Sequence, residues 1–295
     1  MPASLRQLRR EVTGRVRYRG TQLFTGLRAD RRLALAQGAR SHPVSRALLP
    51  RAAEWYARAP VGIAGGLPAG LVLSTAHLAL DHAHAGLLVR GTLEPSVQEA
   101  LRRTVRPGHV VYDVGANIGF FTLAGARLVG PQGRVIAFEP VPWCAAAVAR
   151  NIELNDLAHA EIREEAVGAT AGRARLLVVE EASWSHLDST GRRHPDARED
   201  LDVAVATIDA LVAGGELPAP DVLKIDTEGA ELQVVEGMRE TLERHRPTLI
   251  CELHDTNERF AALMDELGYR TTNLDGPWPV AESPTGIHAL AQPRD

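Results

Sequence analysis

The chain of 295 residues is 45% hydrophobic, 24% charged and 4% aromatic, and its formal net charge is −4 at pH 7. These values exclude a disordered or fibrous protein and indicate a soluble globular protein with one good-sized α/β domain and an extension. Its two cysteines, Cys144 and Cys251, lie in segments that read as a buried helix and a buried strand, and no signal peptide precedes them. We therefore expect a cytoplasmic protein in a reducing compartment.

The N-terminal region differs from the rest of the chain in its charge. Residues 1–60 contain 13 Arg and only three acidic residues, a pattern that would suit an anionic surface. Few aromatic residues stand among these arginines, and Arg is the common cation throughout the chain, so we do not expect a nucleic acid partner. The uncharged stretch Ala59–Leu80 is interrupted by glycines and Pro68. We expect it to pack or to cover a pocket and not to enter a membrane.

From Glu94 onward the hydrophobic pattern predicts alternating helices and strands. The expected helices cover residues 94–105, 119–129, 142–155, 207–213, 229–244 and 257–267. The expected strands are His109–Val114, Arg134–Glu139, 160–165, Ala174–Val179, Val203–Ala206, Asp221–Asp226, Pro247–Leu253, 269–273 and 286–291. This order predicts a mostly parallel, doubly wound α/β sheet whose last two strands pair antiparallel at one edge.

Two of these strands, Ala174–Val179 and Val203–Ala206, flank the polar run Ser183–Asp202. We interpret the two strands as an inserted hairpin or as paired edge strands. The polar run between them reads as a surface loop.

The strongest motif is Asp113-Val-Gly-Ala-Asn-Ile-Gly119, where a buried strand turns into a helix. Its glycines permit a tight turn and a close approach to a ligand, and the helix that follows offers free N–H groups. Twenty residues past Gly119, Glu139 ends the next strand, where its carboxylate can accept hydrogen bonds from two ribose hydroxyls. A dinucleotide is the weaker interpretation, because its glycine pattern would need Gly at Asn117 and Phe120.

A second motif, Leu223-Lys-Ile-Asp-Thr-Glu-Gly-Ala-Glu231, also joins a strand to a helix. Ligands of doubly wound sheets bind at such strand ends. We expect a functional role for Asp226, whereas for Glu231 we favour capping of the following helix. Lys224 is the only lysine of the chain, which either marks a site where guanidinium cannot replace ammonium or is a matter of chance.

A third motif, Cys251-Glu-Leu-His-Asp255, ends the next strand and places His254 beside Asp226. A neutral imidazole there can take a proton from a substrate hydroxyl, so His254 is our first choice of general base. A solvent-facing histidine is the plain alternative. Asp226, Glu252 and His254 can also hold a divalent metal, which we regard as possible but do not favour.

The motifs together resemble those of the FkbM-type methyltransferases over about residues 92–291. The matching residues are Arg106-Pro-Gly, Asp113-Val-Gly-Ala-Asn-Ile-Gly-Phe120, Ala137-Phe-Glu-Pro140, Asn151-Ile-Glu-Leu-Asn155, Ala166-Val-Gly168, Leu223-Lys-Ile-Asp-Thr-Glu-Gly-Ala-Glu231 and Glu252-Leu-His254. The resemblance implies a class I methyltransferase fold, S-adenosylmethionine as the donor, and in many members methylation of a hydroxyl on a sugar or polyketide.

The resemblance also implies roles for individual residues. Asp113 is grouped with the donor-site residues; Gly115, Asn117 and Gly119 would border the methionine moiety, Glu139 the ribose and Glu165-Ala166 the adenine. Asp226 would lie near the reactive methyl, so Asp226, His254 and Lys224 are the candidate catalytic residues.

We divide the chain into an Arg-rich, mainly helical extension over residues 1–91, expected to cover the substrate, and a methyltransferase domain over residues 92–295. The expected partner is a small-molecule hydroxyl acceptor, and a homo-oligomer is an open possibility. A methyltransferase acting on a macromolecule and a non-catalytic adenosyl-binding module are the alternative functions.

Overall fold

The computed structural model describes residues 60–74, 82–179, 186–187, 197–284 and 286–294. Its centre is a seven-stranded sheet in the order β12-β13-β11-β10-β3-β4-β5. The strands are β3 (Val110–Val114), β4 (Arg134–Phe138), β5 (Ala160–Arg163), β10 (Val222–Ile225), β11 (Thr248–Leu253), β12 (Tyr269–Asn273) and β13 (Ile287–Pro293).

All neighbouring strands of this sheet are parallel except that β13 runs antiparallel to both β11 and β12. The expected mostly parallel sheet with antiparallel pairing at one edge is confirmed, and the reversed strand lies one place inside that edge. Strand order reverses between β3 and β10. The carboxyl ends of these two strands therefore flank the crevice where doubly wound folds bind ligands.

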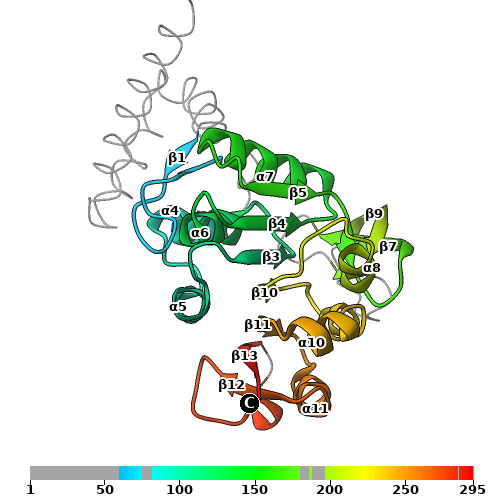
Figure 1. The fold of residues 1–295 in the computed structure, drawn as a ribbon. Coiled ribbons are helices and arrows are strands. Elements are labelled where there is room, and N and C mark those ends of the chain that lie inside the picture. Colours follow the sequence, from blue (N-terminus) through cyan, green and yellow to red (C-terminus); the bar gives the residue numbers. More distant parts are fainter. Residues whose placement is uncertain (1–59, 75–81, 180–185, 188–196, 285, 295) are drawn as a thin grey trace, which may run out of the picture.

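Helices cover both faces of the sheet (Figure 1). One layer contains α4 (His82–Arg90), α5 (Pro95–Thr104), α6 (Phe120–Val129) and α7 (Pro142–Leu154). The opposite layer contains α8 (Ile208–Ala213), α9 (Glu231–Glu236), α10 (Arg239–His245) and α11 (Asn257–Glu266), with a short 3₁₀ helix at Val280–Glu282.

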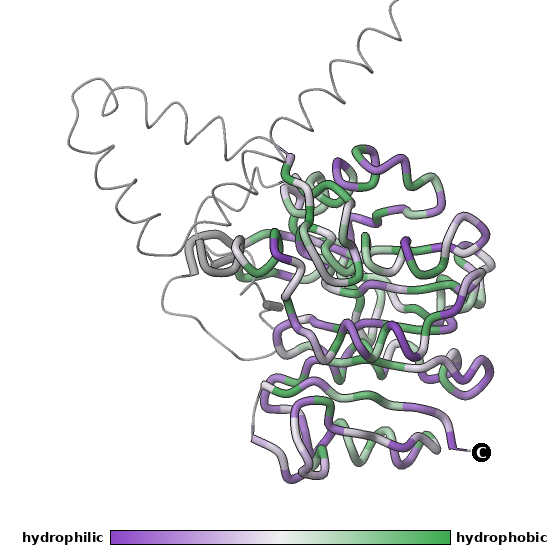
Figure 2. The backbone as a smooth tube through the Cα atoms, turned by 90° about the vertical axis from the view of Figure 1, so that its left-hand side faces the viewer, coloured by the Kyte–Doolittle hydropathy of each residue, from purple (hydrophilic) through white to green (hydrophobic). Residues whose placement is uncertain are grey.

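The strands read as apolar runs because the sheet is buried on both faces. Along β3, Val111 joins the cluster beneath α5 and α6, whereas Tyr112 and Val114 join the cluster on the opposite face. Along most helices hydrophobic and hydrophilic segments alternate, as expected where one side of each helix is buried (Figure 2).

One expected helix and one expected loop differ from the structure. The helix predicted over 229–244 is two helices. The first, α9, ends at Glu236, and its C-cap Gly237 packs so closely that a β-carbon there would lie 2.0 Å from the carbonyl oxygen of Gly168. The prediction of a surface loop over Ser183–Asp202 was wrong in two places, because strand β8 (His186–Leu187) lies within it and strand β9 (Ala197–Ala206) already begins at Ala197, where it pairs with β7 (Gly172–Val179). Backbone pairing with β7 gives this polar segment its strand conformation.

The hairpin itself is confirmed. Strands β7 (Gly172–Val179) and β9 (Ala197–Ala206) pair antiparallel within a separate small sheet. That sheet is completed by β6 (Ala166–Val167) and β8 (His186–Leu187).

The described part of the uncharged stretch packs against the domain, as expected. It forms a small antiparallel pair, β1 (Val61–Gly62) and β2 (Val72–Leu73), and Leu73 is fully buried in the cluster beneath α6. Asn151 of α7 and Asn155, the residue that caps this helix, hold it by side-chain hydrogen bonds. The Oδ1 of Asn155 accepts from the Val72 N–H at 2.7 Å, and the Oδ1 of Asn151 accepts from the Ser74 N–H at 2.6 Å.

Within the described residues, none of the helices combines the length and apolar character needed to span a bilayer. The remainder of the predicted extension, residues 1–59 and 75–81, lies outside the described residues. Its substrate-covering role stays a prediction.

Candidate functional site

The polar side chains at the ends of β10 and β11 lie on one face of the sheet. Side chains alternate between faces, so Lys224 and Asp226 share a face, as do Glu252 and His254 in the next strand. His288 on β13 stands in register with Glu252. The carboxyl end of the sheet thus gathers these residues below the N-terminus of α5.

The donor loop between β3 and α6 has the backbone conformation that its sequence requires. Gly115 and Gly119 have φ of 77° and 89°, and Asn117 has φ of 50°, a left-handed conformation that Asn tolerates better than most residues. A β-carbon on Gly115 would lie 1.7 Å from the carbonyl oxygen of Asp226. This glycine therefore permits the loop to pass the end of β10. The close approach that it allows is between two parts of the chain and not between the loop and a ligand.

Glu139 lies directly beside this loop. Its Oε2 accepts from the Asn117 N–H at 2.7 Å, and its Oε1 accepts from the Val141 N–H at 2.9 Å. Burial raises the pKa of Glu139 to about 7, although these two N–H groups lower it. Because each carboxylate oxygen has two lone pairs, each keeps one acceptor position. The carboxylate therefore fits the two ribose hydroxyls of an adenosyl group.

Other polar atoms around the loop support that fit. The Oδ1 of Asp113, the Oδ1 of Asp226 and the Oγ1 of Thr227 are buried and lack a hydrogen-bond partner. Buried polar groups left without a partner are costly, so such atoms at a strand-end crevice suit a polar ligand.

The residues expected around the adenine lie at the start of the small sheet. Ala166 is buried in a cluster with Val141, two residues after Glu139. Glu165 is held by an ion pair with Arg163, which also contacts Glu216 at 2.6 Å. The structure thus brings both residues near the end of β4, and their contact with adenine stays a prediction.

Lys224 is the cation of the crevice. Its Nζ lies 3.0 Å from Oδ2 of Asp226 and 5.1 Å from the centre of the Phe121 ring. Burial lowers the pKa of Lys224, but the carboxylates of Asp226 and Asp113 raise it more, so the group is an ammonium. The observed contacts give Lys224 a charge-balancing role beside Asp226, and its catalytic role stays a prediction.

Asp226 keeps one oxygen free of this pair. Burial raises its pKa to about 6, while the Lys224 charge opposes the shift and the charges of Glu252 and Glu94 add to it. Asp226 and Glu252 lie with His254 so that one donor atom from each falls within 4.8 Å of the others. The predicted neighbourhood of these three residues is confirmed.

His254 differs from the neutral base expected from the sequence. Its Nδ1 donates to Oε1 of Glu231 at 2.8 Å, and its Nε2 lies 3.3 Å from Glu228 and 3.4 Å from Glu252. Burial lowers the pKa of His254, but the hydrogen bonds of Glu231 and Glu252 and the nearby charges raise it to about 11. This setting favours an imidazolium, which has no lone pair with which to accept a proton.

Glu231 is more than a helix cap. Its side chain is fully buried, and besides His254 it accepts from the Gly229 N–H at 2.6 Å and from Oγ1 of Thr256 at 3.2 Å. Glu231 therefore fixes the orientation of His254. The preference for simple capping underestimated this residue.

Glu94 and His288 belong to the same group of side chains but were not singled out from the sequence. Nε2 of His288 lies 3.4 Å from Oε2 of Glu94 and 3.6 Å from Oε2 of Glu252. Glu94 precedes α5 with φ of 41°. The register of β13 against β11 was the missing information, because it places His288 opposite Glu252.

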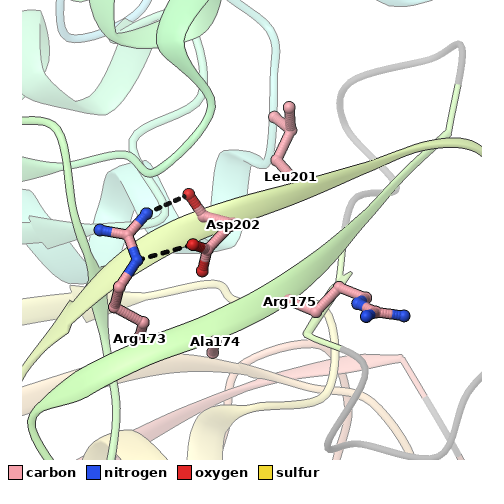
Figure 3. A pocket seen from close by; sticks show the side chains of 5 residues that line it. All are labelled: Arg173, Ala174, Arg175, Leu201 and Asp202. Carbon is pink, nitrogen blue, oxygen red and sulfur yellow. Dashed lines mark hydrogen bonds and ion pairs between the residues drawn. The ribbon is translucent and has the colours of Figure 1, made fainter.

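A hollow of about 570 Å³ lies elsewhere, on the β7–β9 hairpin. It is lined by Arg173, Ala174, Arg175, Leu201 and Asp202, and Arg173 donates to Asp202 across the two strands (Figure 3). None of the predicted site residues lines it, so it is separate from the crevice between β3 and β10.

Residues 113–271 match the model of the methyltransferase FkbM domain. This match covers more than half of the chain and includes the donor loop, Glu139, Asp226 and His254. The chain belongs to the FkbM methyltransferase family.

Individual relatives of this FkbM-family protein share about the same region. The 31-O-demethyl-FK506 methyltransferase FkbM of Streptomyces tacrolimicus is 30% identical over 179 residues, which are 52% of this chain and 68% of the relative. The hexuronic acid methyltransferase AglP of Haloferax volcanii is 28% identical over 161 residues, 55% of this chain and 62% of the relative.

Among solved structures, the methyltransferase FkbM from Methylobacillus flagellatus aligns with a TM-score of 0.42 and 18% identity, over 74% of this chain and 56% of that chain. The class I methyltransferase fold is established here by the sheet order and by the reversed strand β13.

Proposed function

We propose that this methyltransferase transfers a methyl group from S-adenosylmethionine to a hydroxyl of a small molecule. The observation that carries the proposal is the position of Glu139, whose buried carboxylate holds the Asn117 amide of the donor loop and keeps acceptor positions for a ribose. When bound, S-adenosylmethionine supplies a methyl group on a positively charged sulfur. The protein has to orient the acceptor oxygen in line with that methyl group and to receive its proton.

Asp226 is the residue best placed to orient the acceptor. Lys224 holds its Oδ2 at 3.0 Å, whereas its Oδ1 is buried without a partner. A substrate hydroxyl that donates a hydrogen bond to this oxygen would be fixed beside the donor loop, because Gly115 lies directly against the Asp226 carbonyl. In this arrangement the hydroxyl of the methyl acceptor donates a hydrogen bond to Asp226, and Lys224 keeps the Asp226 carboxylate charged.

The role of His254 keeps two alternatives, base or metal ligand. Its Nδ1 is fixed by Glu231, so its Nε2 faces the carboxylates of Glu228 and Glu252. Such a setting holds a cation at Nε2, either a proton or a metal ion. We therefore favour Asp226 over His254 as the group to which the hydroxyl of the methyl acceptor donates its hydrogen bond.

The names of two relatives support the class of acceptor. One acts on 31-O-demethyl-FK506, that is, at an oxygen, and the other on a hexuronic acid. We infer that the acceptor here is a hydroxylated sugar or a polyketide-type natural product. The acidic residues at the strand ends suit an uncharged polyol or a cationic acceptor better than an anionic one, so the hexuronic acid methyltransferase supports a sugar acceptor but not an anionic one.

The proposal is tested with the full chain and S-adenosylmethionine labelled in its methyl group. Labelled methyl should appear on hydroxylated sugars or macrolides, and mass spectrometry should place it on oxygen. Asp226→Asn should lower kcat at least 100-fold while donor affinity, measured by calorimetry, changes little. A protein that binds no donor contradicts the proposal. Methyl transfer found only on proteins or nucleic acids favours the macromolecular alternative instead.

A further inference from the structure

Two histidines at the end of the sheet are arranged in the same way around Glu252. His254 Nδ1 lies 2.8 Å from Glu231, and His288 Nδ1 lies 2.8 Å from Oδ2 of Asp275. Each imidazole is thus tied to a carboxylate at Nδ1. Its Nε2 faces a different oxygen of Glu252, at 3.4 Å for His254 and 3.6 Å for His288.

The His288 half of this arrangement has unused polar atoms. Nε2 of His288 and Oε2 of Glu94 are both buried and lack a hydrogen-bond partner, although they lie only 3.4 Å apart. A charged pair in contact would normally close to about 2.7–2.9 Å. The two carboxylates thus surround the imidazole nitrogen without hydrogen bonding to it.

These separations suit a metal ion placed between the three groups. Ligands about 2.1 Å from one ion at tetrahedral or octahedral angles lie about 3.0–3.4 Å from each other. Donor atoms of Glu94, Glu252 and His288 all lie within 4.8 Å of one another, with the two measured nitrogen–oxygen distances at 3.4 and 3.6 Å. A small inward movement of the side chains would bring the three donor atoms to the spacing that one ion requires.

The surroundings of His288 are those of a metal-binding histidine. A ligand imidazole usually donates its other N–H to a carboxylate, which fixes the ring and leaves the second nitrogen for the ion. Asp275 provides this carboxylate, and it is held in turn by Oγ of Ser96 at 2.6 Å and by the backbone N–H of His288 at 2.7 Å. Three segments of the chain, at Ser96, Asp275 and His288, therefore converge to orient one nitrogen.

We propose that Glu94, Glu252 and His288 form a binding site for a divalent transition-metal ion. One imidazole nitrogen and two carboxylate oxygens are accepted by Mn²⁺, Fe²⁺ or Zn²⁺, whereas Mg²⁺ prefers oxygen ligands alone. Three protein ligands leave coordination positions for water or for an oxygen of a ligand. Glu252 also belongs to the set with Asp226 and His254, so an ion here lies next to the transfer site. The proposal is independent of the identity of the acceptor.

The test is Mn²⁺ binding to the tag-free full-length protein, stripped with a chelator and followed by the EPR signal of free Mn²⁺. His288→Ala and Glu94→Gln should each weaken binding at least 10-fold, and Asp275→Asn should weaken it about 10-fold because it orients His288. His245→Ala removes an exposed histidine on α10 and should bind like the wild type. Thermal unfolding confirms that each variant is folded, with His288→Gln replacing His288→Ala if the latter is not.

The other candidate set provides the contrast. Binding that survives His254→Ala but not His288→Ala supports the proposed site, as do two bound ions of which each substitution removes one. Binding that is lost in His254→Ala and Asp226→Asn but unchanged in His288→Ala overturns it. So does a wild-type protein that binds neither Mn²⁺ nor, in competition, Zn²⁺.

Discussion

The Oε1 atom of Glu231 lies 2.8 Å from Nδ1 of His254, and the Glu231 side chain has no exposed surface. Removing this carboxylate leaves His254, the Gly229 N–H and Thr256 without their acceptor. We expect Glu231→Ala to lower the free energy of unfolding by about 3–5 kcal/mol, the usual cost of breaking a buried charged pair from one side. Urea denaturation measures the effect.

A matched control for this substitution is Glu236→Ala on the same helix. Glu236 is exposed and pairs with Arg239, so its loss should cost no more than about 1 kcal/mol. Equal losses in the two variants would mean that Glu231 acts only through helix capping.

Gly115 should tolerate alanine far less well than Gly108. Both have positive φ, 77° and 88°, but the added β-carbon meets the Asp226 carbonyl oxygen at 1.7 Å in one case and nothing within 4 Å in the other. Gly108→Ala should cost about 1 kcal/mol from backbone strain. We expect at least twice that loss for Gly115→Ala, together with weaker donor binding. Urea unfolding and calorimetry of both variants test the comparison, and similar values would contradict the packing argument.

Glu139→Ala should weaken the binding of S-adenosylmethionine. One or two charge-assisted hydrogen bonds to the ribose are lost, and each is worth about 1.5–3 kcal/mol, so the Kd should rise at least 10-fold in calorimetry. Glu153→Ala, an exposed carboxylate of α7 paired with Arg150, serves as the control. A folded Glu139→Ala protein with wild-type affinity would show that the ribose lies elsewhere.

The stability of the unliganded protein should depend on pH through Glu139. Burial raises its pKa from 4.5 to about 7, so the folded state holds a proton that the unfolded state releases. This contribution is fully present below pH 4.5 and is lost as the pH rises through 7, by about 3 kcal/mol in all. Relative to Glu139→Gln, the wild type should therefore lose stability between about pH 4.5 and 7.5. A constant difference between the two proteins over this range would refute the shift.

Deleting residues 1–58 should lower turnover more than donor binding. The candidate donor residues, from Asp113 to Ala166 with Asp226, all lie in the described domain, where Glu139 is held by the Asn117 and Val141 N–H groups. Donor affinity from calorimetry should stay within about threefold, while the KM for an acceptor rises. Loss of donor binding in a folded truncated protein would show that the predicted domain boundary is wrong.

Local sequence patterns were sufficient to predict the sheet and the donor loop. The turn at Gly115 and the strand end at Glu139 are set by neighbours in sequence, and both lie where they were expected. The set around Glu252 was only half predicted, because Glu94 and His288 reach it from α5 and β13. Which residues of an antiparallel strand face one another depends on register, and no short motif specifies the register of β13.

The protonation state of His254 is the second feature that the sequence alone could not predict. A histidine at a strand end reads as a base when its neighbours are unknown. The structure surrounds His254 with Glu228, Glu231 and Glu252, from a turn, a helix and its own strand. Only their convergence in space turns the expected neutral imidazole into a site for a cation.

Asn151 joins β2 to the donor loop through two buried hydrogen bonds. Its Oδ1 accepts from the Ser74 N–H, and its Nδ2 donates to the carbonyl oxygen of Ile118 in the donor loop at 2.6 Å. A displacement of β2 must therefore either carry the loop with it or break this buried bridge. A ligand that holds the donor loop in place therefore also favours the observed position of β2, to the extent that this bridge couples the two.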